Sequence, residues 1–382
     1  MLRRFALEQD VACRIKKVQN LMKKMELGAI FIVAGGGPGL MGMAKYLTNL
    51  VMWAGRAYVV LGAENPEPAL IQWSSYGSSW NRQEATTSRI ENGDPPGGYG
   101  RAIEIARELA GSTKRIGVEH VNQNWTVGEW DQIRTDLPNF EFVDITEEVD
   151  AIRSIKSNFE IENFYDMGRI MTEAFLRYEK VARPGVRAWD AAAAAEEVLK
   201  AAGCYWGRQK YSLDLRPYTF PTPLDRKLQT DDIILFELVY CSPMGYWCEM
   251  TSLYTFKPLP KDIRAQVEAQ EKVIAACAQV ARAGERIGRV AEVSNQAFKD
   301  LGFPVIGLHT PHCHSIGLDE SDGPSSWFTP DAKLQANMVL SFHPSTLLEG
   351  DRAFLVSDNY LVTPDGAVRL SPKSWTHKLI EI

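Results

Sequence analysis

The stretch Asp232-Ile-Ile-Leu-Phe-Glu-Leu-Val-Tyr240, followed by Cys-Ser-Pro-Met-Gly and then by Tyr246-Trp-Cys-Glu-Met-Thr-Ser-Leu-Tyr-Thr-Phe256, decides the fold of this chain. Its two parts, residues 232–240 and 246–256, are rich in β-branched and aromatic residues, which favour strands. Each part carries one glutamate among apolar neighbours, Glu237 in the first and Glu249 in the second. The stretch lies in the C-terminal part of the chain, whose predicted elements differ in arrangement from those of the N-terminal part.

The C-terminal part of the chain predicts long helices interspersed with strands. The predicted helices cover residues 160–182, 187–202, 262–283 and 289–301, and the predicted strands cover residues 232–240, 246–256, 338–343 and 354–363. Grouped strands of antiparallel character between helices are typical of the α+β class. We therefore expect an α+β domain over residues 156–382.

The N-terminal part alternates helix and strand more regularly. Residues 14–26 place apolar side chains at helical spacing, and the short apolar run of residues 29–33 predicts a strand. Residues 57–61 and 69–73 predict a hairpin, because the turn-rich segment Glu64-Asn-Pro-Glu-Pro68 lies between them. The pattern indicates an α/β domain over residues 1–155.

The composition excludes several classes of protein. The chain has 382 residues, 45% of them apolar, and a net charge of -6 without any basic block, which argues against nucleic-acid binding. No window reaches the roughly 20 apolar residues that a membrane span needs. Glu8 and Asp10 near the N-terminus argue against a signal peptide. Six scattered cysteines are typical of a reduced compartment, so we expect a cytoplasmic protein.

Five stretches, in order along nearly the whole chain, resemble one known superfamily. They are Val143-Asp-Ile-Thr146 with Ile152-Arg-Ser-Ile-Lys156, Leu228–Leu235 with Gly245-Tyr246, His314-Ser-Ile-Gly-Leu318, Asn337–Pro344 and Asp358–Gly366. This succession resembles the pita-bread superfamily of creatinase, aminopeptidase P, prolidase and methionine aminopeptidase. The resemblance implies an N-terminal creatinase-like α/β domain, a C-terminal pita-bread catalytic domain and a homodimer.

The resemblance also implies which positions form the reactive centre. The metal enzymes of the superfamily use two aspartates, one histidine and two glutamates to bridge a pair of divalent ions. Position by position, this chain carries Glu237, Glu249, His314, His343 and Ser357, the last with Asp358 beside it. Only the histidine is unchanged. Because His343 and Ser357 cannot bridge two ions as carboxylates do, we do not expect a two-metal site.

The residues that replace the usual ligands leave three hypotheses open. Glu237, Glu249, His314 and His343 are all competent ligands for a single divalent ion such as iron, zinc or manganese. Without a metal, Glu249 or Glu237 could act as general base and His314 or His343 as the partner acid. A homologue that no longer reacts, with the two glutamates as a buried hydrogen-bonded pair, is the third reading.

The substrate side of the site also departs from the superfamily. His312 would share a strand face with His314 and either lines the pocket or is a packed structural residue. Tyr218, Phe220 and Trp247 are candidates for an aromatic pocket wall or for ordinary core. The substrate-side histidines that the resemblance predicts near Phe220 and Ser321 are missing, as is creatinase's arginine near Ser325. The substrate is therefore expected to be neither a proline peptide nor creatine.

These observations predict a small-molecule hydrolase that acts on a C–N bond of the amide or amidino type by Glu/His acid–base chemistry. A lyase resembling the dimethylsulfoniopropionate lyase branch, with a single metal, and a non-catalytic binding protein are the alternatives. A general base such as Glu249 serves hydrolysis and elimination equally well, so the sequence does not separate these two reactions.

Overall fold

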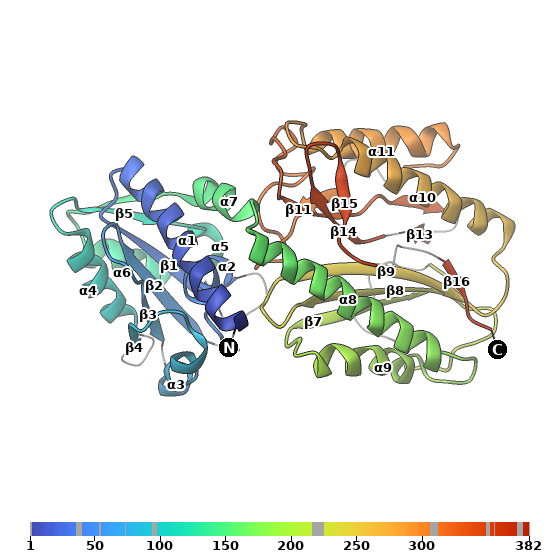
Figure 1. The fold of residues 1–382 in the computed structure, drawn as a ribbon, viewed down its shortest axis with the longest axis horizontal. Coiled ribbons are helices and arrows are strands. Elements are labelled where there is room, and N and C mark those ends of the chain that lie inside the picture. The colour runs from blue at the N-terminus through green and yellow to red at the C-terminus, as the bar shows by residue number, and fades with distance from the viewer. Residues whose placement is uncertain are drawn as a thin grey trace. The chain divides into compact units, whose positions relative to one another are not determined.

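The computed structural model describes most of the chain, and it forms two compact units, Met1–Arg153 and Ser154–Ile382 (Figure 1). The described residues are 2–35, 40–52, 55–72, 74–93, 98–215, 225–305, 312–348, 352–354, 356–372 and 377–381. Each unit has its own sheets and its own buried apolar core.

The N-terminal unit is built on a six-stranded sheet of order β4-β3-β2-β1-β5-β6. Its strands are β1 (Ala29–Gly35), β2 (Arg56–Gly62), β3 (Ala69–Gln72), β4 (Ile90–Asn92), β5 (Arg115–Val118) and β6 (Glu141–Asp144). Its helices are α1 (Leu2–Lys24), α2 (Gly42–Thr48), α3 (Ser75–Glu84), α4 (Tyr99–Ala110), α5 (Val121–Asn124), α6 (Val127–Asp136) and α7 (Thr146–Ser154). β2 and β3 pair antiparallel, as the turn-rich segment between them predicts. The mixed sheet with its helices confirms the α/β prediction for this part of the chain.

Helix α1 begins twelve residues earlier than the helix predicted over residues 14–26. The reason is that its buried face extends upstream: Leu7 and Val11 are buried together with Ile15, Val18 and Met22. These five positions recur at intervals of three and four residues, which places them on one helical face. The sequence signal was present, but the polar residues between Leu7 and Arg14 concealed it.

The C-terminal unit contains two four-stranded sheets, with orders β16-β9-β8-β7 and β10-β11-β14-β15, and a two-stranded ribbon, β12-β13. The first sheet comprises β7 (Gly207–Leu213), β8 (Ile233–Cys241), β9 (Trp247–Thr255) and β16 (His377–Leu379). The second comprises β10 (Cys313–Ser315), β11 (Val339–Phe342), β14 (Asp358–Val362) and β15 (Ala367–Arg369), and the ribbon comprises β12 (Thr346–Leu348) and β13 (Arg352–Phe354).

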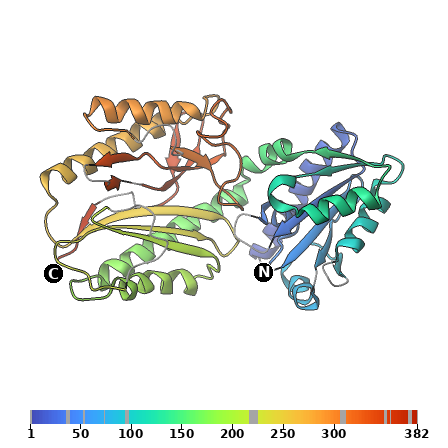
Figure 2. The same cartoon turned by 180° about the vertical axis from the view of Figure 1, so that it is seen from behind.

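Two pairs of helices accompany these sheets. They are α8 (Asn158–Val181) with α9 (Ala188–Ala201), and α10 (Lys261–Val280) with α11 (Gly288–Asp300). Seen from the two opposite sides, α8 lies in front of the β7–β9 sheet and then behind it, so it covers one face of that sheet (Figures 1 and 2). The second pair lies beside β11, β14 and β15 (Figure 1). This α+β arrangement is the predicted pita-bread architecture.

The β8–β9 hairpin fixes where the two glutamates lie. Gly245 has a φ of 90° in the connection between the strands, a conformation that glycine adopts without steric cost. The resulting register pairs Glu237 with Thr251 and Val239 with Glu249. Because side chains alternate along each strand, both glutamates project from the same face of the sheet.

None of the described helices is long and apolar enough to cross a membrane. All six cysteines are free thiols, and five of them are buried.

Candidate active site

The candidate site lies where the two sheets of the C-terminal unit meet. The main chain of Glu249 on β9 is held by the side-chain amide of Asn359 on β14, whose Nδ2 donates to the Glu249 carbonyl at 2.7 Å. Two residues away, the Thr251 amide donates to the Ser357 carbonyl at 3.0 Å, and the Ser357 amide donates to Thr251 Oγ1 at 3.0 Å. These bonds join the sheets independently of the Glu249 carboxylate.

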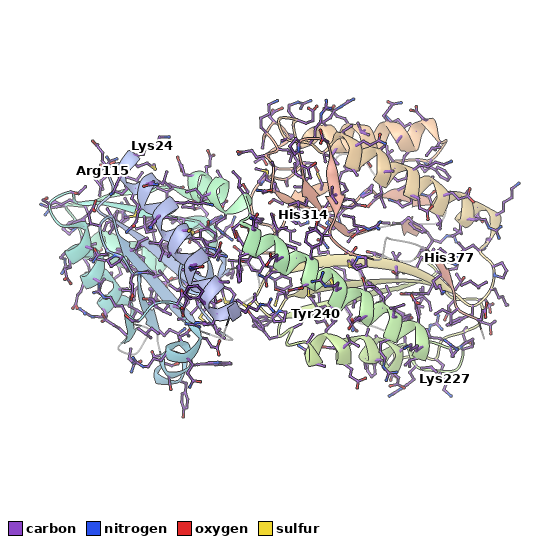
Figure 3. All side chains as sticks on the ribbon, viewed as in Figure 1. Lys24, Arg115, Lys227, Tyr240, His314 and His377 are labelled. Atoms are coloured by element: carbon purple, nitrogen blue, oxygen red, sulfur yellow. The ribbon has the colours of Figure 1, made fainter. Side chains whose placement is uncertain are left out.

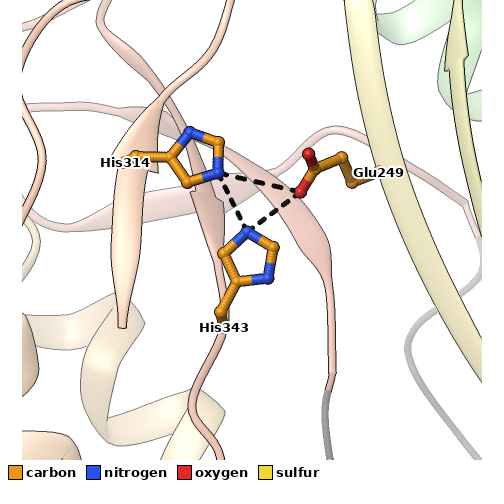
Figure 4. A group of neighbouring side chains, drawn as sticks. All are labelled: Glu249, His314 and His343. Atoms are coloured by element: carbon orange, nitrogen blue, oxygen red, sulfur yellow. Dashed lines mark hydrogen bonds and ion pairs between the residues drawn. The ribbon is translucent and has the colours of Figure 1, made fainter. Parts of the chain in front are cut away.

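Three side chains converge at this junction: Glu249, His314 and His343 (Figure 4). Glu249 Oε2 lies 2.9 Å from His343 Nε2 and 3.8 Å from His314 Nε2. The two Nε2 atoms are 3.0 Å apart, and the rings stack with centroids 5.0 Å apart. The structure therefore brings together three of the four residues that the sequence predicted as catalytic or metal-binding groups.

The second sheet supplies both imidazoles because of its register. His314 on β10 pairs with Ser341 on β11, and His343 follows β11 directly and shares the face of Ser341. His314 lies within the C-terminal unit, near β11 and β14 (Figure 3). Ser341 Oγ donates a hydrogen bond of 2.9 Å to Glu249 Oε2, so the carboxylate contacts both sheets.

Glu237 occupies a neighbouring position, outside the three-residue group. Its Oε2 forms an ion pair of 3.0 Å with Lys210 Nζ, and its Oε1 accepts a hydrogen bond from Ser357 Oγ. Ser357 Oγ lies 3.2 Å from His343 Nδ1. Among the described residues, Glu237 is therefore linked to the centre through Ser357.

Asp358, beside Ser357, does not take the place of the missing glutamate. Its Oδ1 accepts from the amide of Asn359 at 2.9 Å and lies 3.2 Å from Ser371 Oγ. Adjacent residues of an extended segment project to opposite faces, so Asp358 is expected to point away from the face on which Ser357 contacts Glu237.

The charges of the centre are set by burial and by mutual contact. Burial alone would raise the pKa of the Glu249 carboxyl, but the facing imidazoles of His343 and His314 outweigh it and hold that pKa well below its usual range. Burial lowers the pKa of His314, although Glu249 opposes this effect. Near neutral pH the group thus presents an ionised carboxylate and a neutral His314 ring.

The residues predicted to bind substrate have different positions. His312 is buried, with Nδ1 3.2 Å from Ser294 Oγ, and its Nε2 has no hydrogen-bond partner among the described residues. Burial, together with the charge of His343, lowers the pKa of His312 to about 4. Trp247 is buried and lies two residues before Glu249, on the same face of β9. Tyr218 and Phe220 lie outside the described residues.

Two cationic residues near the centre were not predicted from the sequence. Lys210 and Arg208 lie on β7, and Lys210 pairs directly opposite Glu237 in the β7–β8 register. Arg208 Nη1 donates to Glu320 Oε2 at 2.8 Å, and this hydrogen bond, together with the charges of Glu320, Glu249 and Glu237, raises the pKa of Arg208. The alternation of polar Lys210 and Ser212 with apolar Tyr211 and Leu213 was the available signal.

Comparison with known proteins identifies the family of this chain. Residues 162–364 match the metallopeptidase family M24, and residues 14–155 match the creatinase/prolidase N-terminal domain. The chain belongs to metallopeptidase family M24. This result confirms the predicted membership of the creatinase/aminopeptidase P superfamily and the predicted class of each part of the fold.

Individual relatives are distant. An uncharacterized hydrolase/peptidase of Sinorhizobium fredii is 24% identical over 92% of this chain and 92% of its own length. An uncharacterized peptidase of Staphylococcus saprophyticus is 25% identical over 59% of this chain, which spans only 65% of that relative's length. The X-Pro aminopeptidase from Thermotoga maritima has a TM-score of 0.80 at 18% identity, covering 95% of this chain and 99% of that structure. The last similarity concerns the fold alone.

Among the described residues, the three side chains of the centre fit a single divalent ion. A bridged pair requires carboxylates that contact both ions, and here Glu249 is the only carboxylate of the candidate metal group formed by the described residues. The donor atoms of Glu249, His314 and His343 are 2.9, 3.0 and 3.8 Å apart. Ligands at roughly 2.0–2.1 Å from a tetrahedral ion lie about 3.3 Å from one another, within this range.

Proposed function

We propose that this M24 protein is a hydrolase that cleaves a C–N bond of the amide or amidino type in a small molecule. Glu249, His343 and His314 form its reactive centre. The observation that carries the proposal is the contact of 2.9 Å between the Glu249 carboxylate and His343 Nε2 in a buried cluster. Paired carboxylates and imidazoles at such distances are suited to proton transfer.

The proposed reaction uses water as the nucleophile. The water oxygen attacks the carbon of the scissile C–N bond while Glu249 accepts a proton from the water. The C–N bond breaks, and the departing nitrogen takes a proton from His343. Glu249 can accept the proton because its carboxylate is ionised near neutral pH. The proton then passes from Glu249 to His343 Nε2, 2.9 Å away, which restores both groups.

The same three side chains would hold a single divalent ion as ligands. Such an ion would supply Lewis-acid polarisation of the scissile group and would lower the pKa of a bound water. In that case Glu249 and the two histidines orient the reacting groups, and the proton transfers fall to other groups near the centre. The lyase alternative has no support in the family match, which describes peptidases.

We propose that the substrate is not a proline peptide. Four of the five ligand positions of the two-metal peptidases are changed, and the expected substrate-side histidines near Phe220 and Ser321 are absent from the sequence. The residues expected to bind a proline peptide are therefore absent from these positions of the sequence. The altered centre supports a different small molecule with a C–N bond.

The test is a hydrolysis assay with a panel of small amides and amidines in water labelled with heavy oxygen. Glu249→Gln and His314→Ala should each lower the rate at least about a hundredfold, because each removes a group of the centre. Glu268→Gln, an exposed position on α10, is the matched control and should not change the rate. Product without heavy oxygen would rule out hydrolysis, and unchanged rates in both site variants would refute the assigned centre.

Metal analysis of the purified protein separates the two forms of the proposal. A single bound ion predicts close to one equivalent of metal, lost in His343→Ala. Less than about a tenth of an equivalent, with activity that survives chelators, would end the single-ion form and leave acid–base chemistry by side chains alone.

A further inference from the structure

We infer that Glu237 and Ser357 form a positioning pair that keeps a proton on Nδ1 of His343 and thereby directs Nε2 toward Glu249. This inference deepens the proposed function, because it concerns the same centre. It gives Glu237 a role distinct from that of a general base or a metal ligand.

The contacts run in one line from the β7–β8 sheet to the centre. Lys210 Nζ contacts Glu237 Oε2 at 3.0 Å, and Glu237 Oε1 accepts the hydroxyl hydrogen of Ser357. Ser357 Oγ lies 3.2 Å from His343 Nδ1, and His343 Nε2 lies 2.9 Å from Glu249 Oε2. No contact in this line joins Glu237 directly to Glu249 or His314.

Counting hydrogen atoms fixes the direction of each bond. A serine hydroxyl has one hydrogen to donate, and an ionised carboxylate can only accept. Since Ser357 donates to Glu237, its oxygen can only accept from His343, so Nδ1 of His343 carries a proton. This leaves Nε2 of His343 facing Glu249. In the charged ring Nε2 donates a hydrogen bond to Glu249, and in the neutral ring its lone pair can bind a metal ion.

His314 shows the same pattern with a simpler partner. Its Nδ1 lies 3.0 Å from the main-chain carbonyl of Ser315, which can only accept, so this ring also carries its proton on Nδ1. Both imidazoles therefore present Nε2 to the centre. An imidazole is commonly oriented for ligation or proton transfer by fixing its other ring nitrogen in this way.

Several contacts hold the positioning pair in place. Ser357 is fully buried, and its main chain makes two hydrogen bonds of 3.0 Å with Thr251. Glu237 lies between Thr251 on one neighbouring strand and Lys210 on the other. A buried ion pair contributes little net stability compared with apolar residues, so stability alone gives little reason for a charged residue here.

The structure provides a nearly isosteric switch. In Glu237→Gln, the ammonium group of Lys210 attracts the amide oxygen, so the amide nitrogen faces Ser357. That nitrogen donates to Ser357 Oγ, and the Ser357 hydrogen turns toward His343 Nδ1. Nδ1 must then give up its proton. The substitution changes the proton position on His343 without removing a heavy atom from the centre.

The experiment is nitrogen NMR of protein labelled at histidine with ¹⁵N, with the His343 signals assigned by their loss in His343→Gln. The wild-type protein should show a proton on Nδ1, and Glu237→Gln should show none there. A proton on Nδ1 in both proteins, or in neither, would overturn the inference. If Glu237→Gln fails to fold, Ser357→Ala takes its place in the experiment. This substitution only shortens one buried side chain, and the protected Nδ1 proton signal of His343 should be lost.

A kinetic cycle provides the second readout. Loss of an outer-layer partner typically costs about 10- to 100-fold, so we expect a decrease of that size in Glu237→Gln. In the Ser357→Ala background, Glu237→Gln should have no further effect, because Glu237 acts through Ser357. A further decrease there would show that Glu237 acts on the substrate or a metal directly. The NMR result needs no substrate, so it stands or fails separately from the proposed hydrolysis.

Discussion

At the scale of single residues, Gly317 shows how closely the centre's surroundings are packed. A Cβ at this position would lie 1.7 Å from Asp322 Oδ2 and 2.8 Å from Lys156 Nζ. These two groups form a buried ion pair of 2.9 Å. The Gly317 carbonyl also accepts from the amide of Trp247 at 2.7 Å. Position 317, directly before Leu318, therefore has to be glycine because of space, not because of backbone conformation.

This packing makes a prediction for Gly317→Ala. Disrupting a buried ion pair costs about 3 kcal/mol, and we expect a loss of that size in the free energy of unfolding. Gly128→Ala, on helix α6 with nothing near its added Cβ, should instead be neutral or slightly stabilising. Urea denaturation of the three proteins is the measurement. A Gly317→Ala protein as stable as the wild type would contradict the packing argument.

The site residues differ in how far the sequence could predict them. The positions of Glu249, His314 and His343 followed from motif order, because each lies on a strand of the superfamily's pattern. The contact between Lys210 and Glu237 did not follow, because it depends on the pairing of β7 with β8. No local feature of residues 207–213 specifies which strand will lie opposite, since register is set by the completed sheet.

At the scale of elements, helix α8 begins with a reciprocal pair of hydrogen bonds. Ser157 Oγ accepts from the Glu160 amide at 3.1 Å, and Glu160 Oε2 accepts from the Ser157 amide at 2.9 Å. Tyr246, at the start of the β9 region, lies 3.3 Å from the other oxygen of Glu160 through its hydroxyl group. The cap therefore links the start of the long helix to the β8–β9 hairpin.

The cap gives a second stability prediction. Ser157→Ala removes one of these bonds and should lower the free energy of unfolding by about 1 kcal/mol, the usual effect of losing a helix cap. Ser112→Ala, at an exposed turn, is the control and should have no effect. Calorimetry or urea denaturation checks both. Equal losses in the two variants would mean that the cap contributes nothing of its own.

Elements with strong periodicity were predicted well, and those with weak periodicity were missed. The helix predicted over residues 160–182 is α8, Asn158–Val181, and its buried face recurs at helical spacing. The helices α3 and α6 were not predicted, because few of their residues are buried and the apolar pattern is correspondingly faint. Short strands such as β10, with three residues, carry too little pattern for any period to be recognised.

At the scale of the whole molecule, stability should depend on a charged cluster of the N-terminal unit. His120 Nδ1 contacts the buried carboxylate of Glu119, and Nε2 lies 3.3 Å from Asp150 Oδ2. Burial by itself would lower the pKa of His120, but the hydrogen bonds with Asp150 and Glu119 raise it to about 10. The ring is therefore charged at neutral pH, and it links the end of β5 to helix α7.

The sign of the pH dependence follows from this raised pKa. In the unfolded chain His120 has a pKa of about 6.5, so its stabilising effect is complete below that pH and is lost as the pH rises through about 10. His120→Asn, which tolerates the φ of 45° at this position, should be less stable than the wild type at pH 6. The difference in unfolding free energy between the two proteins should shrink toward pH 10.5. A difference independent of pH would refute the role of the charged ring.

The order of architectures along the chain, α/β and then α+β, was predicted correctly because it depends on the succession of many elements. The fold does not predict the reaction in the same way, because a fold shared with aminopeptidases and prolidases supports more than one chemistry. The sequence predicts which side chains stand at the superfamily's ligand positions. What only the structure shows is that the five positions divide into an inner group of three, Glu249, His314 and His343, and an outer pair, Glu237 and Ser357.

The junction of β9 with β14 bears on how such a centre can change during evolution. Asn359 holds the main chain of Glu249, the Thr251 amide donates to the Ser357 carbonyl, and the Ser357 amide donates to Thr251 Oγ1. The alignment of the sheets therefore does not depend on the reactive side chains. Ligand positions can therefore be exchanged one at a time without a loss of architecture. A lineage of this fold could abandon two bridged ions gradually, passing through folded intermediates at each substitution.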